Sequence, residues 1–292
     1  MIKIDLNNCD SCGLCLRICH ESCLHFIDGF LSIDYKYCST CTQCIAVCPK
    51  QALSWDGIKP DEFDKSLYPE SIQLAELLKE RRTIRDFTKQ PIDKSLLEEI
   101  AGYALYAPTH DFNMRVLIVD DETIINQIDA LILKFSTSLY KHVYKPKIIY
   151  FLLKLFTPTY EFEFLRAKPK LENAIKRNRG LKSKPVAVIM IIGNKKTALS
   201  LESAQYALYN IDLYAQTKGI GCRNLVGNQL ILNGNKQFKK SVGINRDEKI
   251  YGTIALGFPA VRFRNKVTGK KIKIQWNVME DENTKNIIYG KQ

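Results

Sequence analysis

Eight cysteines of this chain stand in two runs that share one spacing. The runs read CDSCGLCLRIC and CSTCTQCIAVC, so both follow C-x2-C-x2-C-x3-C, and each cysteine of the first recurs 29 residues later. Such runs bind cubane iron–sulfur clusters: three thiolates of one loop bind three irons, and in two-cluster proteins the fourth binds the other cluster. The spacing therefore predicts two 4Fe–4S clusters, one on Cys9, Cys12, Cys15 and Cys48, the other on Cys38, Cys41, Cys44 and Cys19.

Zinc and disulfide bonds are the competing uses of these cysteines. Zinc sites usually combine paired CxxC knuckles or Cys with His, and four cysteines in one such run, twice, do not follow that pattern. Disulfide bonds need an oxidising compartment, and nothing in the sequence marks the chain as secreted. The cluster interpretation is therefore preferred.

The same block resembles the bacterial two-cluster ferredoxins over about the first 58 residues. His20 follows the first run where the family would usually carry the proline that Pro49 supplies after the second. Cys23 is surplus to the two ligand sets, and we interpret it as a buried thiol without a special role, with alternative ligation as the other reading.

A basic run ends the first helix predicted after this block. It reads Arg81-Arg82-Thr83-Ile84-Arg85, and it resembles the Arg-Arg-Ser-x-Arg run of the FMN-dependent nitroreductase family. In that family the first basic residue and the hydroxyl approach the ribityl chain and phosphate of FMN, and the last Arg pairs with the phosphate. Guanidinium groups suit this role because they bind phosphate oxygens bidentately. By itself, a basic helix end also fits a solvated surface that suits the helix dipole.

A loop at residues 107–113, APTHDFN, resembles the family's Ala-Pro-Ser-x-x-Asn-x-Gln-Pro-Trp segment, which lies along the flavin. The resemblance implies contacts from Pro108, Thr109, His110 and Asn113. Asn113 comes one residue late, so Thr109 and His110 are the better candidates, and His110 fits an ordinary surface loop equally well.

A glycine turn, Gly219-Ile220-Gly221-Cys222, ends the helix predicted at 203–218 and resembles the family's Gly-Leu-Gly-Ser/Thr-Cys turn. Its backbone, at Ile220 and Gly221, would run against the flavin near N5, since glycine permits close approach. Cys222 is expected to be a packed small residue. The downstream runs VGI and ALGFP match further family landmarks in order, and Lys270 and Lys271 stand where the family places a late basic residue on the phosphate. The sequence contains no G-x-G-x-x-G turn, so we do not expect a separate nicotinamide site.

The predicted elements that position these motifs fall into two groups. The first group contains a strand at 2–6, a hairpin at 24–33 and a closing strand at 52–55. The second contains helices from Ser71 to about 82, from 91 to 107, at 121–138 and at 203–218, and strands at 115–120, 185–192 and 250–257. Ser71 is the expected cap of the first helix, and Leu105 is expected on the apolar face of the second. From Lys270 the tail is predicted to be an exposed strand or arm.

The formal charge of +12 is unevenly distributed, because residues 1–60 carry −1 and residues 61–292 carry +13. This favours docking between the two parts and the steering of an acidic electron carrier or an anionic substrate. Nucleic-acid binding lacks a supporting motif, and a generally basic solvated surface remains an alternative. The longest apolar run, at 186–192, is too short to cross a bilayer. We therefore expect a cytoplasmic protein without membrane or nucleic-acid partners, in an anaerobic host.

Together these features predict an α+β protein. A small ferredoxin-like α+β domain (1–58) would be joined by a linker (59–70) to a nitroreductase-type α+β sandwich (71–292). The family resemblance implies a homodimer with FMN at its interface, a carboxy-terminal arm around the partner, and a substrate lid in 139–180.

The expected function is an oxidoreductase that takes electrons from a ferredoxin-type donor through two 4Fe–4S clusters to FMN. The final acceptor would be a nitro-, quinone- or other electron-poor small molecule. The alternatives are a dedicated reductase or dehydrogenase of another substrate, a non-enzymatic electron carrier or redox sensor, and NAD(P)H as the donor. No essential catalytic acid or base is predicted, because side chains in such sites mostly position groups and tune the cofactor.

Overall fold

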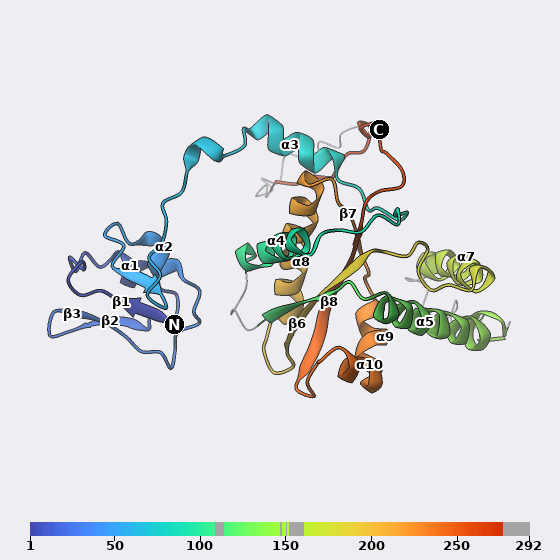
Figure 1. Cartoon of the computed structure of the whole chain (residues 1–292), viewed down its shortest axis with the longest axis horizontal. Coiled ribbons are helices and arrows are strands. Elements are labelled where there is room, and N and C mark those ends of the chain that lie inside the picture. The colour runs from blue at the N-terminus through green and yellow to red at the C-terminus, as the bar shows by residue number, and fades with distance from the viewer. Residues whose placement is uncertain (109–113, 147, 150, 152–160, 277–292) are drawn as a thin grey trace, which may run out of the picture. The chain divides into compact units, whose positions relative to one another are not determined.

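The computed structural model describes residues 1–108, 114–146, 148–149, 151 and 161–276 (Figure 1). Among these residues, no helix combines the length and the apolar character that crossing a membrane requires. The expected contacts of Thr109, His110 and Asn113 lie outside the described residues.

The first elements of the chain form two small antiparallel sheets and two short helices. Strand β1 (Ile2–Ile4) pairs with β4 (Leu53–Trp55), and β2 (Leu24–Ile27) pairs with β3 (Phe30–Ile33). Asp28 and Gly29 both have positive φ, of 51° and 83°, as a two-residue hairpin turn that matches the strand twist requires. The predicted hairpin and closing strand are confirmed.

The sequence duplication is repeated in the backbone. Helices α1 (Leu14–Ile18) and α2 (Gln43–Val47) begin 29 residues apart, and each is preceded by a left-handed residue, Gly13 at φ 75° and Thr42 at φ 62°. Each helix ends at an extended cysteine, Cys19 at φ −72° and Cys48 at φ −75°. The two halves therefore present their cysteines on equivalent scaffolds.

A four-stranded antiparallel sheet organises the second group of elements, with the strand order β5-β6-β8-β7. Its strands are β5 (Met114–Val119), β6 (Ala187–Asn194), β7 (Gly221–Asn224) and β8 (Glu248–Gly257). Side chains alternate between the faces of a strand. Along β6, Ile189 and Ile191 enter one apolar core, whereas Val188 and Met190 enter the other.

Helices cover both faces of this sheet (Figure 1). Helices α4 (Lys94–Gly102) and α8 (Ser200–Thr217) supply the core that contains Ile189. Helices α5 (Glu122–Leu139), α9 (Asn228–Gly234) and α10 (Lys236–Ser241) supply the core that contains Val188. The remaining helices are α3 (Ser71–Glu80), α7 (Glu161–Arg177), 3₁₀ turns at Lys65–Leu67 and Tyr103–Tyr106, and a π-helical turn at Tyr140–Tyr144. The predicted α+β class is confirmed.

Three local predictions were wrong. Glu70, not Ser71, is the cap of α3, and its backbone N–H donates to Gln73 Oε1 at 2.9 Å. Leu105 is exposed because α4 ends at Gly102 and a 3₁₀ turn follows, which changes the angular spacing. The glycine run does not remain a turn, because Gly221 already belongs to β7.

The tail is a separate unit from Phe263 onward. In its described part, residues 263–276, there is no helix or strand, and the side chains are exposed. The strand form of the predicted tail is therefore absent from these residues.

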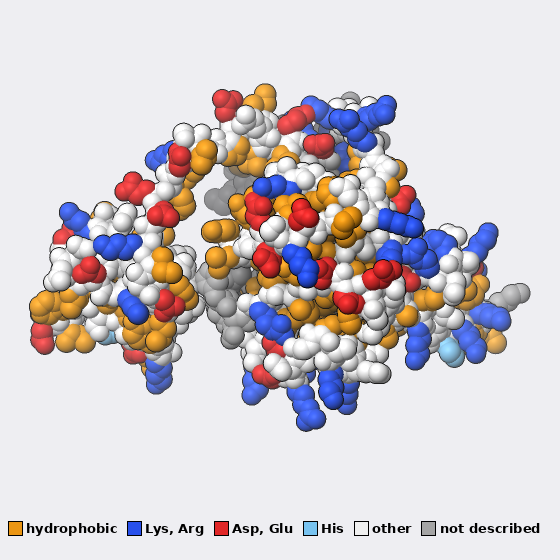
Figure 2. Space-filling model, viewed as in Figure 1, with side chains coloured by type: hydrophobic (Ala, Val, Ile, Leu, Met, Phe, Trp, Pro, Cys, Tyr) orange, Lys and Arg blue, Asp and Glu red, His pale blue; other side chains and the backbone are white. Residues whose placement is uncertain are grey.

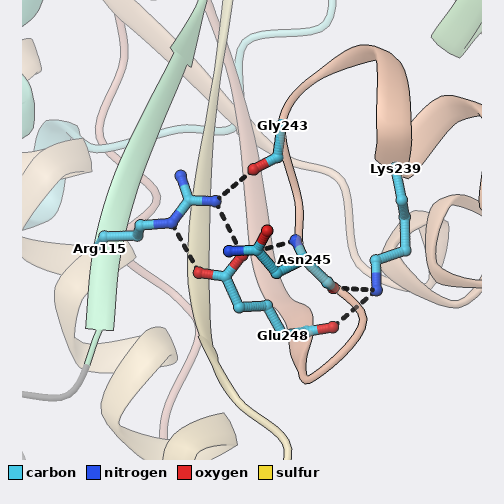
Figure 3. Close-up of polar contacts among 5 residues, drawn as sticks. All are labelled: Arg115, Lys239, Gly243, Asn245 and Glu248. Carbon is cyan, nitrogen blue, oxygen red and sulfur yellow. Dashed lines mark hydrogen bonds and ion pairs between the residues drawn. The ribbon is translucent and has the colours of Figure 1, made fainter.

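One polar network joins β5 to β8 at one end of the sheet, and β6 lies between these two strands (Figure 3). Arg115 on β5 donates from Nε and Nη2 to the two carboxylate oxygens of Glu248 on β8, at 2.8 and 3.0 Å. Arg115 also donates to Gly243 O at 2.9 Å, and Lys239 Nζ donates to the backbone oxygens of Asn245 and Glu248. The Arg115 guanidinium lowers the pKa of Glu248 to about 2. Arg115 therefore has a structural role.

Candidate functional site

Two small hollows lie among the cysteines of the first segment. One is lined by Cys9, Cys12, Cys15 and Cys48, together with apolar residues that include Phe26 and Leu31. The other is lined by Cys19, Cys38, Cys41 and Cys44, together with Ile2, Leu24 and Ile33. Each hollow thus takes three thiols from one run and the fourth from the other run. The structure brings together the two sets that the spacing predicted.

The thiols surround each hollow instead of converging on one point. Within the described residues, no three His, Cys, Asp or Glu side chains are grouped closely enough to hold a single metal ion. A cubane cluster has a different requirement, because each of its irons binds its own thiolate. The four thiols of the predicted sets that line each hollow have the ligand type and number that a cubane requires.

Backbone N–H groups also point at the sulfurs. Thr40 N donates to Cys38 Sγ at 3.4 Å, and Ala52 N donates to Cys48 Sγ at 3.3 Å. Left-handed residues, Ser11 in one run and Thr40 in the other, shape the loops. Successive N–H groups in such turns form concave sites that stabilise negative charge. These loops can therefore stabilise thiolates and the cluster sulfides between them.

Burial disfavours charge on several of these thiols when no metal is bound. Burial raises the pKa of Cys15 above its ordinary value and raises the pKa of Cys44 to about 11. Metal binding would replace the proton with a cation and reverse this effect.

Cys23 is buried, as predicted, but its place is unexpected. It lines the hollow of Cys19, Cys38, Cys41 and Cys44, and its Sγ lies 3.5 Å from Cys19 Sγ. Burial and the neighbouring Cys19 thiol raise the pKa of Cys23 to about 12. Five thiols therefore face one hollow, and four face the other.

A second candidate site forms where three motif segments meet at the edge of the large sheet. Ile84 N donates to Cys222 O at 2.9 Å, which lays the basic run along β7. Thr88 N donates to Phe258 O at 2.8 Å, and Ala260 N donates to Asp86 O at 3.0 Å. The basic run, the glycine run and the end of β8 are thus held together by backbone hydrogen bonds, although they are far apart in sequence.

Gly221 makes this approach possible. A Cβ at Gly221 would lie 2.5 Å from Ile84 Cγ1, which is far inside van der Waals contact. Ile220 is buried in the core, and its N–H donates to Ala215 O at 2.9 Å. Cys222 is buried as expected, and burial raises its pKa well above the ordinary value, so it is not a nucleophile at neutral pH.

The side chains of the basic run have different partners. Arg81 Nη1 donates to Asp212 Oδ2 at 3.3 Å, and Asp212 is a buried carboxylate on α8 whose pKa burial raises. Arg82 Nη1 donates to the backbone oxygens of Lys79 and Arg81, so it caps the end of α3. Thr83 is half-buried and Arg85 is exposed. Arg81 and Arg85 therefore retain donors for an anion, whereas Arg82 interacts mainly with the helix end.

Among the described residues, the structure does not bring the other predicted flavin contacts together with the basic run. Pro108 is exposed, and it immediately precedes residues 109–113. Lys270 and Lys271 are exposed in the separate tail unit.

Sequence reasoning missed Arg223. It lies on β7, two residues after Gly221 and therefore on the same face of the strand. Burial, and then the charges of Arg85 and Arg177, lower its pKa. Among the described residues no carboxylate pairs with Arg223. A charged residue at an inward strand position was the available signal. Where the structure describes the chain, no carboxylate offsets the charges of Arg85 and Arg177 that act on Arg223, and such an excess of positive charge favours an anion.

Charge elsewhere is less organised. Figure 2 shows Lys and Arg side chains dispersed over the visible face with Asp and Glu between them. On this face the excess positive charge forms no single patch.

Comparisons with known proteins agree with this geometry. A family model described as "Nitroreductase family" matches residues 78–258. A search of curated proteins found no match. Among solved structures, the chain is similar to a nitroreductase with bound FMN from Desulfitobacterium hafniense DCB-2, with 17% identity over 70% of this chain and 97% of that chain, and a TM-score of 0.52. It is also similar to oxidised iodotyrosine deiodinase bound to FMN and 3-iodo-L-tyrosine, with 20% identity over 70% of this chain and 99% of that chain, and a TM-score of 0.51. At these identities the two structures establish the fold alone.

Proposed function

Because this chain belongs to the nitroreductase family, we propose that it couples two 4Fe–4S clusters to FMN in order to reduce a small molecule. Membership of the family makes it an FMN-dependent oxidoreductase. Electrons enter from a reduced ferredoxin-type carrier, and the acceptor is a nitro-, quinone-like or other electron-poor compound. The organisation is a cluster domain at 1–58, a linker at 59–70 and a flavin domain at 71–292.

The crosswise lining of the two hollows is the observation that carries the cluster assignment. Each hollow combines three cysteines of one run with one cysteine of the other. This exchange is the ligand pattern of two-cluster ferredoxins. Cys9, Cys12, Cys15 and Cys48 would hold one cluster, and Cys38, Cys41, Cys44 and Cys19 the other.

The meeting of the basic run and β7 supports the FMN site. Arg81, Thr83 and Arg85 would bind the phosphate and the ribityl chain, and Arg223 adds positive charge beside Arg85. The absence of a side chain at Gly221 lets the backbones of these segments pack closely. The two similar solved structures both contain FMN. By analogy with the family we propose a homodimer, with Lys270 and Lys271 adding phosphate contacts.

When bound, the clusters would pass single electrons and FMN would deliver them to the substrate. The chain's own residues bind, orient and tune these groups. Asp212 orients Arg81 through their ion pair, and the N–H donors of the cysteine loops stabilise negative charge on the sulfurs.

The test follows flavin absorbance in anaerobic protein mixed separately with reduced ferredoxin and with NADPH. Rapid bleaching by ferredoxin that is lost in Cys38→Ala/Cys41→Ala establishes the clusters as the entry route. Dithionite provides the control, since it must still bleach the flavin of the variant if the FMN site is intact. Bleaching by NADPH alone, unchanged in the variant, would refute the proposed direction and point to electrons leaving through the clusters.

Turnover then identifies the acceptor class. Nitroaromatics, quinones and enones would be offered to the reduced enzyme, and product formation would be compared across them. Reversible flavin cycling without any product would instead favour an electron carrier or redox sensor.

A further inference from the structure

The hollow lined by Cys19, Cys38, Cys41 and Cys44 contains a thiol that the ligand pattern does not use. Cys23 is 4% exposed, and its Sγ lies 3.5 Å from Cys19 Sγ. Its backbone is held at the start of β2, where Cys23 O accepts from Asp34 N at 2.8 Å. The thiol is therefore held beside the ligand position by ordered structure.

The internal repeat supplies a comparison for this position. Cys48 is the counterpart of Cys19, and four residues beyond it Ala52 is the counterpart of Cys23. Ala52 is also buried, at 1% exposed, and its N–H donates to Cys48 Sγ. The equivalent position of the other half therefore packs with alanine. Packing alone does not explain why position 23 is a cysteine.

The two sulfurs are close enough for either of them to serve one iron position. Cys23 Sγ lies 3.5 Å from Cys19 Sγ, so a displacement of about that distance would bring it to the place of the Cys19 thiolate. A cluster iron already has three sulfides and needs one thiolate, so Cys23 can replace Cys19 but cannot be added to it.

We propose that Cys23 is a reserve ligand of the cluster held by Cys38, Cys41, Cys44 and Cys19, and that it binds the same iron when Cys19 is lost. This inference rests on the proposed function, since it presupposes the cluster. In the exchange with both cysteines present, the bond from iron to Cys19 breaks and the bond to Cys23 forms. The proton of the Cys23 thiol passes to the Cys19 thiolate, so the cluster keeps its charge and oxidation state. The other cluster has no such reserve, because Ala52 occupies the equivalent place.

The experiment compares iron and acid-labile sulfide content, and EPR spectra after dithionite reduction, in anaerobically purified full-length proteins. Wild type and Cys23→Ala should hold about eight irons per chain, as two cubanes require. Cys19→Ala should keep about eight irons with an altered spectrum, whereas Cys19→Ala/Cys23→Ala should lose iron, because one iron of that cluster then has no thiolate. Cys48→Ala is the matched control, and it should lose iron for the same reason.

A gain-of-function variant keeps the test decisive if a single variant folds poorly. Cys48→Ala/Ala52→Cys should hold more iron than Cys48→Ala, because it creates the reserve position in the other half. Equal iron loss in Cys19→Ala and Cys48→Ala, retention of the cluster in Cys19→Ala/Cys23→Ala, or no gain from Ala52→Cys would each overturn the inference. Absence of iron from wild type would instead refute the cluster assignment itself.

Discussion

Replacement of Gly221 by alanine should weaken FMN binding by displacing the basic run that packs against β7. The new Cβ would lie 2.5, 2.9 and 3.0 Å from three side-chain carbons of Ile84. Ile84 cannot easily move away, because it is buried, β-branched and held by the hydrogen bond from its N–H to Cys222 O. The strain must therefore displace the chain that carries Thr83 and Arg85.

The contact geometry sets the magnitude. An ordinary carbon contact is about 3.4–4 Å, so Ile84 has to shift by about 1 Å. Overpacking of this kind costs about 1–3 kcal/mol of folding free energy. If about 1.4 kcal/mol of that strain is relieved only by misplacing the phosphate ligands, FMN binding weakens roughly tenfold.

Two measurements check this reasoning. The dissociation constant of FMN would be obtained from flavin fluorescence on titration of the apoprotein, and stability from the urea midpoint by circular dichroism. Gly234→Ala is the matched control, because a Cβ there meets nothing within 4 Å in α9. It should bind FMN like wild type and be equally or slightly more stable. Unchanged FMN affinity and an unchanged midpoint in Gly221→Ala would refute the close packing of these segments.

Three further predictions concern charged groups. Glu248→Gln should destabilise the protein by about 1–2 kcal/mol at pH 7, a value reduced for the partial exposure of Arg115. The folded-state pKa of Glu248 is about 2, against an ordinary value of 4.5. The stability that its carboxylate contributes is therefore complete above pH 4.5 and is lost as the pH falls toward 2. A difference in urea midpoint between wild type and Glu248→Gln that does not shrink in acid would contradict this prediction. Asp212→Asn should weaken FMN binding several-fold by releasing Arg81, and it should also lower the urea midpoint because it leaves Arg81 without its buried partner; an unchanged FMN dissociation constant would exclude the positioning role. Arg223→Ala should weaken FMN binding about tenfold and weaken competition by inorganic phosphate to a similar degree; unchanged competition would place the phosphate elsewhere.

Patterns that are local in the chain could be predicted well from sequence. The two cysteine sets follow from a spacing rule, because a cluster is bound by loops of a few residues whose shape depends on nearby residues. The hairpin at Asp28-Gly29 and the apolar strand β6 follow from turn chemistry and hydrophobicity for the same reason. Family motifs also predicted that the basic run and the glycine run belong to one site, and the hydrogen bond from Ile84 N to Cys222 O brings the two runs together.

Features that depend on distant partners could not be predicted in this way. Strand β7 is short and contains Gly, Cys and Arg, so its conformation comes from pairing with β8 and not from propensity. The Arg81–Asp212 ion pair joins residues 131 positions apart, and the charges of Arg85 and Arg177 act on Arg223 only because the fold brings three distant segments near one another.

Sequence alone therefore predicted the kinds of chemistry, which are thiolate ligation of clusters and guanidinium binding of an anion. Tertiary structure decided which groups share a site. It placed Cys23 in one hollow and Ala52 beside the other, although the two occupy equivalent positions of a repeat. The physical reason is that ligand type is a property of a side chain, whereas proximity is a property of the packed chain.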